Sequence, residues 1–309
     1  MRWLIALLMP VAAFAQDPPA EPLDPLAAEI AFVDDVNRMT VPVAIAGAGP
    51  FRFIVDTGAE RTVVSHELAR KLALSPGRTV RLTAMTGTSS VGTVMVPSIT
   101  VGEPPRLGSD ARIEAPALHA ANIGALGILG LDTLQGQKVT IDFDKQTISV
   151  SPSARRRSAS VASDEIVVRA RSIFGQLVVT DARYRGQTIR VILDTGSVVS
   201  MGNSALRRKL DAADRKRDQP IELISVTGET LQAGYTSIGR VSLGSMAFEN
   251  LPIAFADAAP FEKFGLSDRP AMMLGMDALR LFRRVDIDFA NREVRLRLPR
   301  NARRPVQLL

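Results

Sequence analysis

Apolar and polar residues alternate through much of the chain in short runs, and the runs end at glycine, proline or small polar residues. A period of two is typical of β-strands with one buried face, and such endings are typical of tight turns. Two runs, residues 53–55 and 191–193, are apolar throughout, and an aspartate follows each at once. Residues with helical spacing form only short stretches. The pattern therefore predicts a mainly β protein.

The same pattern occurs twice along the chain. The heptapeptide FIVDTGA at 53–59 recurs as VILDTGS at 191–197. A Val-Val-Ser tripeptide follows each copy, at 63–65 and at 198–200, which indicates a longer turn in the first copy. A duplicated segment of this length predicts two similar lobes, each with one or two short helices.

Later segments match in the same order. Helical stretches at 66–72 and 204–210 are 138 positions apart, as are the two aspartates. Two apolar residues followed by glycine occur once in each half, and both halves close with two alternating runs around a polar turn. Two tripeptides between β-prone runs are predicted as hairpin tips. These tips are Met85, Thr86 and Gly87 in the first half and Val226, Thr227 and Gly228 in the second.

The two ends of the chain differ from the repeats. Arg2, a short apolar run and a small-x-small triplet at 13–15 are typical of a secretory signal peptide, which predicts a periplasmic or secreted protein. The apolar run is too short to span a bilayer comfortably, so we expect no stable membrane insertion after its removal; a retained anchor is the alternative. The expected divisions are a signal peptide at 1–15, a tether or pro-segment at 16–39, an N-terminal lobe at 40–150, a linker at 151–164, a C-terminal lobe at 165–299 and a basic tail at 300–309.

Composition narrows the function classes. The chain is 46% hydrophobic and 23% charged, as in ordinary globular proteins, so disorder does not explain its many glycines and prolines. It has no cysteine, which excludes disulfides, thiol nucleophiles and thiolate metal sites. The net charge is +6, but the basic clusters fall in the expected linker, a helix end and the tail, with no aromatic residues between them. We therefore expect no nucleic-acid partner.

The repeated Asp-Thr-Gly motif carries the candidate chemistry. A carboxylate at the end of a buried strand is costly unless it is hydrogen-bonded or paired. The glycine permits a tight turn, and the threonine hydroxyl can reach the neighbouring lobe. Asp56 and Asp194 occupy equivalent places in a duplicated chain, so they would face each other across a pseudo-twofold axis. Two close carboxylates share a proton and supply a base and an acid in one site, without a metal or cofactor.

These motifs, each followed later by two apolar residues and glycine, resemble the aspartic peptidases of the pepsin and retropepsin type. The likeness is closest to the retroviral-like proteases of bacteria. It implies an all-β fold of two tandem, closed β-barrel lobes with the active site between them. Retroviral members dimerise one lobe, whereas the second lobe here is attached covalently, so a monomer is expected. Leu131 and Met276 stand where retroviral enzymes usually have arginine, which puts that family's inter-lobe salt bridge in doubt.

The resemblance also implies the roles of individual residues. Asp56 and Asp194 are expected as the catalytic dyad, and the hairpin tips as flaps over the substrate. Gly130 and Gly275 would lie behind the two motifs. Apart from the resemblance, the two motifs differ: the Ser197 hydroxyl could donate to the outer oxygen of Asp194, whereas Ala59 cannot do so for Asp56, so we expect Asp194 to hold the charge more readily and Asp56 the proton. The residues expected to support the dyad are Thr57, Gly58, Thr195, Gly196 and Ser197.

The leading hypothesis is an aspartic endopeptidase that hydrolyses polypeptides with a water activated by Asp56 and Asp194. One alternative is a periplasmic protein that binds peptides in the same cleft without cleaving them. Another is a precursor that cleaves only its own tether or linker. No metal-binding spacing such as His-Glu-x-x-His occurs, so no metal is expected.

Overall fold

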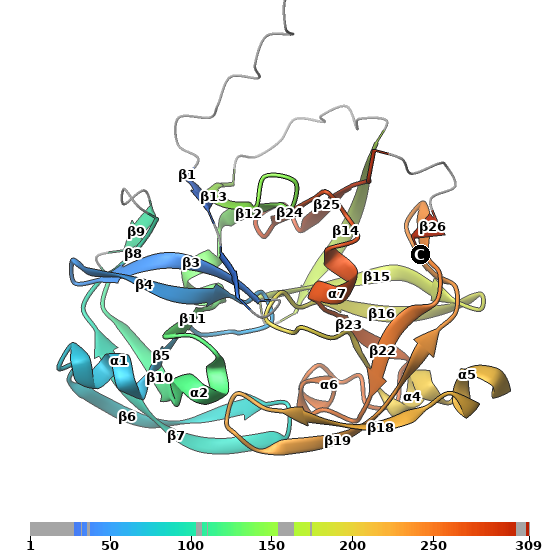
Figure 1. The fold of residues 1–309 in the computed structure, drawn as a ribbon, viewed down its shortest axis with the longest axis horizontal. Helices are drawn as coiled ribbons and strands as arrows, with labels where there is room; N and C mark the ends of the chain where they lie inside the picture. The colour runs from blue at the N-terminus through green and yellow to red at the C-terminus, as the bar shows by residue number, and fades with distance from the viewer. Residues whose placement is uncertain are drawn as a thin grey trace, which may run out of the picture.

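A computed structural model describes residues 28–31, 33–35, 38–102, 107–109, 111–153, 164–173, 175–300 and 307–308. The expected signal peptide, most of the expected linker and most of the basic tail lie outside the described residues. The described part is mainly β and forms two lobes side by side, as predicted (Figure 1). Within it, no helix is both long and apolar enough to cross a membrane.

One sheet forms the N-terminal lobe, in the order β6-β7-β10-β5-β11-β4-β3-β8-β9, with β2 beside β3. The strands are β2 (Val33–Asp35), β3 (Arg38–Ile45), β4 (Ala48–Val55), β5 (Val63–Ser65), β6 (Pro76–Ala84), β7 (Gly87–Val96), β8 (Ile99–Val101), β9 (Leu107–Ser109), β10 (Ile113–Leu118) and β11 (Gly127–Leu129). The helices are α1 (His66–Lys71), α2 (Ala120–Ile123) and α3 (Leu131–Leu134).

The C-terminal lobe repeats this arrangement strand by strand, as β18-β19-β22-β17-β23-β16-β15-β20-β21, and β26 adds to its edge. The strands are β15 (Gln176–Tyr184), β16 (Gln187–Leu193), β17 (Met201–Gly202), β18 (Gln219–Ile224), β19 (Thr230–Ile238), β20 (Val241–Leu243), β21 (Met246–Phe248), β22 (Leu251–Phe255), β23 (Ala271–Leu274) and β26 (Gln307–Leu308). The helices are α4 (Ser204–Arg207), α5 (Ala212–Lys216), α6 (Ala259–Lys263) and α7 (Met276–Leu279).

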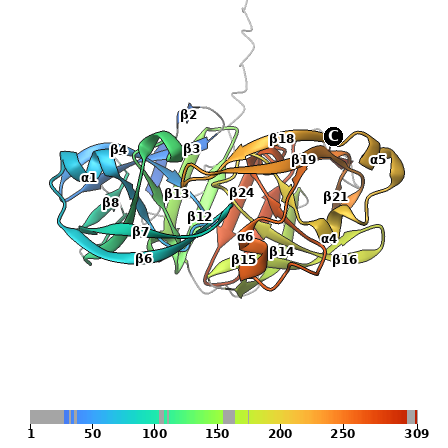
Figure 2. The same cartoon turned by 90° about the horizontal axis from the view of Figure 1, so that it is seen from below.

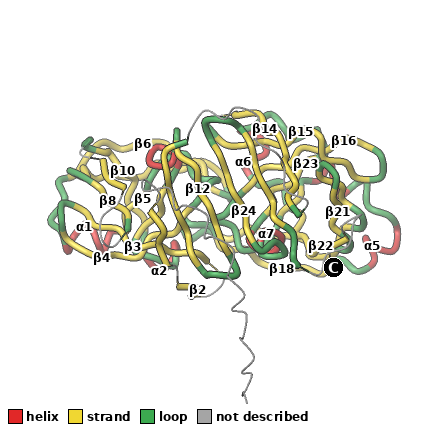
Figure 3. Tube along the Cα trace, turned by 90° about the horizontal axis from the view of Figure 1, so that it is seen from above, coloured by secondary structure: helices red, strands yellow, loops and turns green. Residues whose placement is uncertain are grey.

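A sheet contributed by both lobes joins them at the top of Figure 1, and Figure 3 shows it from above. Its strands pair antiparallel in the order β1-β13-β12-β24-β25-β14. Their bounds are β1 (Ala28–Ala31), β12 (Gln137–Asp142), β13 (Thr147–Pro152), β14 (Glu165–Ile173), β24 (Arg284–Asp288) and β25 (Glu293–Arg297). The largest group of buried apolar side chains extends through this sheet into both lobes, so the two lobes share one core.

The strand order also corrects one expectation. Among the described residues no hydrogen-bonded pair joins β6 to β9, so the N-terminal lobe is not a barrel closed by hydrogen bonds. β6 extends instead toward the other lobe, as Figure 2 shows from below. Its tip reaches α6, where the amide of Ala259 donates to the carbonyl of Met85 at 3.1 Å. The hairpin of β6 and β7 therefore reaches from the N-terminal lobe to the C-terminal lobe.

The pairing of β5 and β17 corrects the expected register of the repeat. Val63 in β5 is opposite Ile128 in β11, and Met201 in β17 is opposite Met273 in β23. Val63 and Met201 are therefore equivalent, 138 positions apart like the aspartates. The predicted match between the Val-Val-Ser tripeptides is wrong, and the first turn is not longer, because register depends on strand pairing and not on similar letters.

The helices begin where the sequence predicted, but there are more of them. Ser65 caps α1 by accepting from the amide of Leu68 at 3.1 Å, and Asn203 caps α4 by accepting from Leu206 at 2.9 Å. The described residues contain three helices in one lobe and four in the other, instead of one or two in each. The additional ones have four or five residues, which is too short to produce a helical period.

Candidate active site

Each aspartate lies directly after a central strand of its lobe. The last three residues of β4 are all buried, so the side chains on both faces of the strand are covered, and β4 pairs with β3 and β11 in the sheet. The amide of Asp56 then donates to the carbonyl of Leu129 in β11 at 3.1 Å. Asp194 follows β16, and its amide donates to Leu274 at the same distance. The parallel partner strand therefore fixes the backbone position of each aspartate.

The turn after each aspartate holds one oxygen of the carboxylate. Oδ1 of Asp56 accepts from the amides of Gly58 at 2.7 Å and Ala59 at 3.0 Å. In the other lobe, Oδ1 of Asp194 accepts from Gly196 at 3.0 Å and from the next amide at 3.1 Å. The repeated Asp-Thr-Gly sequence thus builds the same turn twice.

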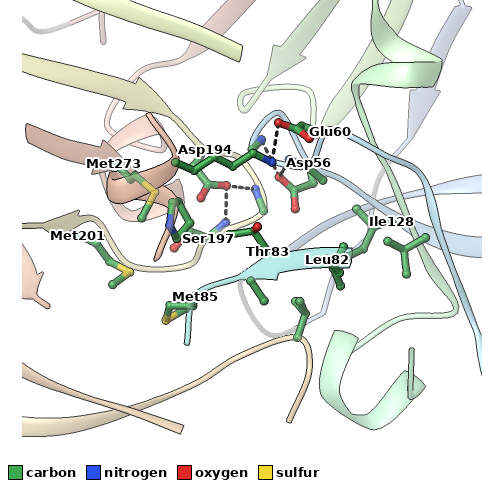
Figure 4. Close-up of a pocket in the computed structure, with 18 of the residues that line it drawn as sticks. Asp56, Glu60, Leu82, Thr83, Met85, Ile128, Asp194, Ser197, Met201 and Met273 are labelled. Carbon is green, nitrogen blue, oxygen red and sulfur yellow. Dashed lines mark hydrogen bonds and ion pairs between the residues drawn. The ribbon is translucent and has the colours of Figure 1, made fainter. Parts of the chain in front are cut away.

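Each carboxylate lies at the lobe boundary, against the turn of the opposite lobe. A methyl group placed on Gly196 would lie 2.2 Å from Cγ of Asp56, and one placed on Gly58 would lie 2.8 Å from Cγ of Asp194. Each turn therefore packs against the acid of the opposite lobe, and only glycine leaves the space. Asp56 and Asp194 line a single cleft, as Figure 4 shows.

Threonine hydroxyls tie the two turns together beneath the acids. The Thr57 hydroxyl donates to the carbonyl of Leu193 at 3.0 Å and accepts from the amide of Thr195 at 3.2 Å. Reciprocally, the Thr195 hydroxyl donates to Val55 at 2.8 Å and accepts from the amide of Thr57 at 3.0 Å. Both threonines are buried, so this exchange fixes one turn relative to the other without competition from water.

The role expected for the Ser197 hydroxyl is wrong in this structure. The hydroxyl donates to the carbonyl of Val199 at 2.8 Å, and only the backbone amide of Ser197 donates to Asp194. A hydroxyl has a single proton, so it does not also donate to the carboxylate. The argument that Asp194 holds its charge more readily than Asp56 therefore loses its basis.

Behind each turn lies a second carboxylate that the sequence reasoning did not assign. Oδ1 of Asp132 accepts from the amide and the hydroxyl of Thr62 at 2.8 and 2.7 Å. In the C-terminal lobe, Asp277 accepts from the amide of Ser200 at 2.9 Å and from its hydroxyl at 2.6 Å. The constant offset of 138 positions, had it been applied to Thr62, would have identified Ser200 as its equivalent.

These second carboxylates position the glycines of the apolar-glycine motifs. The Gly130 amide donates to the hydroxyl of Thr62 at 3.2 Å, and the Gly275 amide donates to that of Ser200 at 3.0 Å. A methyl group on Gly130 would lie 2.4 Å from the backbone carbon of Arg61. The motifs therefore pack directly behind the turns, as the resemblance implied, and in each lobe the aspartate two positions after the glycine braces this packing through Thr62 or Ser200.

The two predicted hairpin tips cross over to the opposite lobes. Met85 packs with the apolar side chains of the C-terminal lobe, and Val226 with those of the N-terminal lobe. The hydroxyl of Thr86 donates to the carboxylate of Glu229 at 2.5 Å, so the hairpins also touch each other. Thr227 bonds the Ser225 hydroxyl within its own hairpin at 3.0 Å.

Glycines at both tips have positive φ, +151° at Gly87 and +89° at Gly228, which allows the tight bends. Gly228 lies against Asn122 of α2, in the opposite lobe. Every tip residue singled out from the sequence is therefore at a tip, and the crossing is a tertiary feature that no local pattern announced.

The cleft beneath the hairpins has a volume of about 490 Å³ and receives side chains from both lobes. An ion pair crosses it, with Nζ of Lys263 in α6 lying 2.7 Å from Oε1 of Glu60. Gln176 in β15 also crosses, and its amide group donates to the carbonyl of Gly58. Neither contact had a sequence signal, because Glu60, Gln176 and Lys263 belong to no repeated motif.

No group of three or more acidic, histidine or cysteine side chains in the described part of the chain is placed to hold a metal ion. The two histidines, His66 and His119, lie side by side with ring centroids 4.8 Å apart. Asp286 and Asp288, which share a strand face, bond the hydroxyls of Thr140 and Ser153. Polar partners from the protein thus account for that face.

Comparison with known families divides the chain at the same place as the repeat. Residues 41–136 match the family described as "gag-polyprotein putative aspartyl protease". Residues 180–278 match the family described as "Aspartyl protease". Each matched segment contains one Asp-Thr-Gly turn and one hairpin tip. No curated protein matches the chain.

Proposed function

The chain belongs to the retropepsin-like aspartic peptidases, with one protease domain in each half, and from this premise we propose that it is an endopeptidase with a single inter-lobe active site. The observation that carries the proposal is the crossed packing of Gly58 and Gly196 against the opposite acids. Because this packing holds Asp56 and Asp194 in one cleft, both acids of the dyad come from a single chain. The functional unit we propose is accordingly a monomer.

The chemistry follows from two carboxylates that cannot both ionise cheaply at close range. One aspartate holds a proton and the other is ionised. The ionised aspartate takes a proton from a water molecule, whose oxygen attacks the peptide carbonyl carbon, while the protonated aspartate gives its proton to the carbonyl oxygen. The resulting diol collapses when the aspartate that took the water proton gives it to the amide nitrogen, the carbon–nitrogen bond breaks, and a diol hydroxyl returns its proton to the other aspartate. The step needs no covalent intermediate.

The fixed parts of the site support this chemistry. Backbone amides hold Oδ1 of Asp56 and of Asp194, and the threonine exchange keeps the two turns from separating. Positioning of this kind accounts for much of the rate that an enzyme gains over the reaction in water. The hairpins cover the cleft, so substrate must enter as an extended strand or after the tips part.

The substrates we propose are polypeptides outside the cytoplasm, because the first fifteen residues predict export. Apolar side chains dominate the cleft walls near the dyad, which supports apolar residues on both sides of the cleaved bond.

The test compares wild-type protein with Asp56→Asn and Asp194→Asn on a peptide library, with mass spectrometry as the readout. Each variant is expected to lose at least about a thousandfold in kcat/KM, since either change removes the acid–base pair. Ser197→Ala is the matched control, because Ala59 already occupies the equivalent place in the other turn. Cleavage that survives both asparagine variants would falsify the proposal. Wild-type protein that binds peptides and leaves them intact would indicate a binding protein instead.

A further inference from the structure

The cleft has two apolar walls, and their side chains differ in kind. Strand pairing makes Val63 equivalent to Met201, and Ile128 equivalent to Met273. All four side chains line the cleft. At these equivalent places the N-terminal lobe therefore presents branched aliphatic residues and the C-terminal lobe presents methionines. Figure 4 shows the methionines near Asp194, and Ile128 with Leu82 on the side of Asp56.

The hairpin that crosses over each wall increases the difference. On the N-terminal side, Val226 packs with Val63, Leu118 and Ile128, and Ala59 borders the same group. Branched side chains have few rotamers, and a wall made of them adjusts little to a different occupant. We name this group the branched wall.

On the C-terminal side, Met85 packs with Met201 and Met273, together with the partly buried Val199, Leu223 and Phe264. Met201 and Met273 are 1% and 6% exposed, so the pocket they line lies against packed core. Methionine is unbranched and polarisable, and it fits many shapes at low cost. We name this group the methionine wall.

We propose that the branched wall is a selective subsite and the methionine wall a tolerant one. The protease would then discriminate among apolar side chains on one side of the cleaved bond and accept most of them on the other. This inference rests on the proposed function, and it adds which residues determine specificity. For a rigid apolar pocket, one methylene group changes kcat/KM by about 10- to 200-fold. The methionine wall should reduce that to a few-fold.

The test exchanges the walls at equivalent positions. Met201→Val with Met273→Ile gives the C-terminal lobe the branched residues, and Val63→Met with Ile128→Met does the reverse. Peptides carrying Val, Leu, Ile, Met or Phe at one of the two positions beside the cut bond are compared by kcat/KM. In the first pair, the ratio of kcat/KM between the best and the worst peptide should rise about tenfold at the tolerant position. The same ratio at the selective position should not change. The reverse pair should widen the preference at the selective position alone.

A binding series separates this inference from the proposed function. Peptides with a hydroxyethylene group in place of the scissile amide cannot be cleaved, and their hydroxyl fixes the register at the dyad. Their dissociation constants, measured by calorimetry on the same variants, should show the same asymmetry. Unequal binding without peptide cleavage would refute the proposed function alone. Cleavage with equal selectivity at both positions would refute the inference alone. The same holds if the exchanges alter the selectivity at neither position, or at both positions equally. Thermal unfolding checks that each variant is folded. If the pair Met201→Val with Met273→Ile does not fold, Met273→Ile alone takes its place.

Discussion

The two turns that hold the acids have the same backbone contacts and different side chains. In residues 58–61 the sequence is Gly-Ala-Glu-Arg, and in residues 196–199 it is Gly-Ser-Val-Val. What the lobes share faces inward: the amides on Oδ1, the crossed threonines and the aspartate brace. What they do not share lines the cleft. The repeat therefore specifies a frame for the two carboxylates, and the residues outside the frame give each side of the cleft its own character.

Among changes that leave both acids in place, the largest expected effect comes from filling the space between a turn and the opposite acid. In Gly196→Ala the new methyl group would lie 2.2 Å from Asp56, compared with 2.8 Å from Asp194 in Gly58→Ala. Displacing a catalytic group by about 1 Å costs roughly a hundredfold in rate. We expect Gly196→Ala to lose at least that in kcat/KM, and Gly58→Ala to lose less.

Gly92→Ala is the control for these variants, because nothing lies within 4 Å of the added methyl group and its φ is not positive. It should keep wild-type activity. Kinetics and thermal unfolding are measured together, so that a lost fold is not mistaken for a displaced acid. Equal, small losses in both alanine variants would show that the carboxylates are not held against the opposite turns.

The frame could be predicted from the sequence because it is local and repeated. Asp-Thr-Gly after an apolar run contains within a few residues the strand, the acid and the turn, and duplication implies that two such units face each other. The register after the turn could not be predicted reliably. The two Val-Val-Ser tripeptides look equivalent in the sequence, but the strand pairing makes Thr62 equivalent to Ser200 instead. The Ser197 hydroxyl had two acceptors in reach, and sequence alone did not choose between them.

The crossing of the hairpins was beyond prediction for a different reason. Alternation around Met85 and Val226 shows that each belongs to a hairpin tip, but not which lobe that tip contacts. The contact depends on how the two lobes are oriented, and the shared sheet at 137–152 and 284–297 determines that orientation. The Glu60–Lys263 ion pair likewise joins residues that no periodicity connects.

The second prediction tests whether the two braces are equivalent. Asp277→Ala leaves the buried amide and the buried hydroxyl of Ser200 without their acceptor. Asp132→Ala removes the acceptor of the buried Thr62 amide, whereas the Thr62 hydroxyl still bonds the Thr133 hydroxyl at 2.8 Å. An unsatisfied buried polar group costs about 1–3 kcal/mol, so Asp277→Ala, which leaves two such groups, should lose about 2–6 kcal/mol of unfolding free energy, and Asp132→Ala, which leaves one, about 1–3 kcal/mol. Urea titration measures the loss. Asp132→Asn, which keeps one acceptor oxygen, should lose less than Asp132→Ala. A loss confined to one lobe would contradict the equivalence.

The third prediction concerns a contact that only one side of the cleft has. Glu60 pairs with Lys263, whereas the residue equivalent to Glu60 is Val198. The two side chains are 36% and 33% exposed, so solvent screens the pair and its coupling energy should be below about 1 kcal/mol. A double-mutant cycle with Glu60→Gln and Lys263→Met measures it, and added salt should weaken it. A coupling energy above about 2 kcal/mol that does not change with added salt would mean that the pair makes a main contribution to holding the two lobes together.

The smallest expected effect concerns the base of the N-terminal hairpin. Glu114 in β10 accepts from the guanidinium of Arg78 in β6 at 2.6 Å, and also from the Arg78 amide and the hydroxyl of Thr93. The Arg78 side chain is the main cause that lowers the pKa of Glu114 from its ordinary 4.5 to about 2. A carboxylate whose pKa is lower in the folded state stabilises the fold fully above the unfolded value and loses that effect as pH falls through the folded value. The hairpin base should therefore stay intact in mildly acid solution.

The measurement is the melting temperature of wild-type protein and Glu114→Gln between pH 7 and pH 2. The difference between them should be no more than a few degrees, because the Arg78 side chain is 84% exposed and solvent screens the interaction. It should be constant down to about pH 4.5 and shrink steadily toward pH 2, where Glu114 becomes protonated in both states. Arg78→Met removes the main cause of the lowered pKa. In this background, the difference in melting temperature between proteins with and without Glu114→Gln should therefore be smaller and should vanish at a higher pH. A wild-type difference that persists unchanged at pH 2 would show that the contribution of Glu114 does not depend on its ionisation.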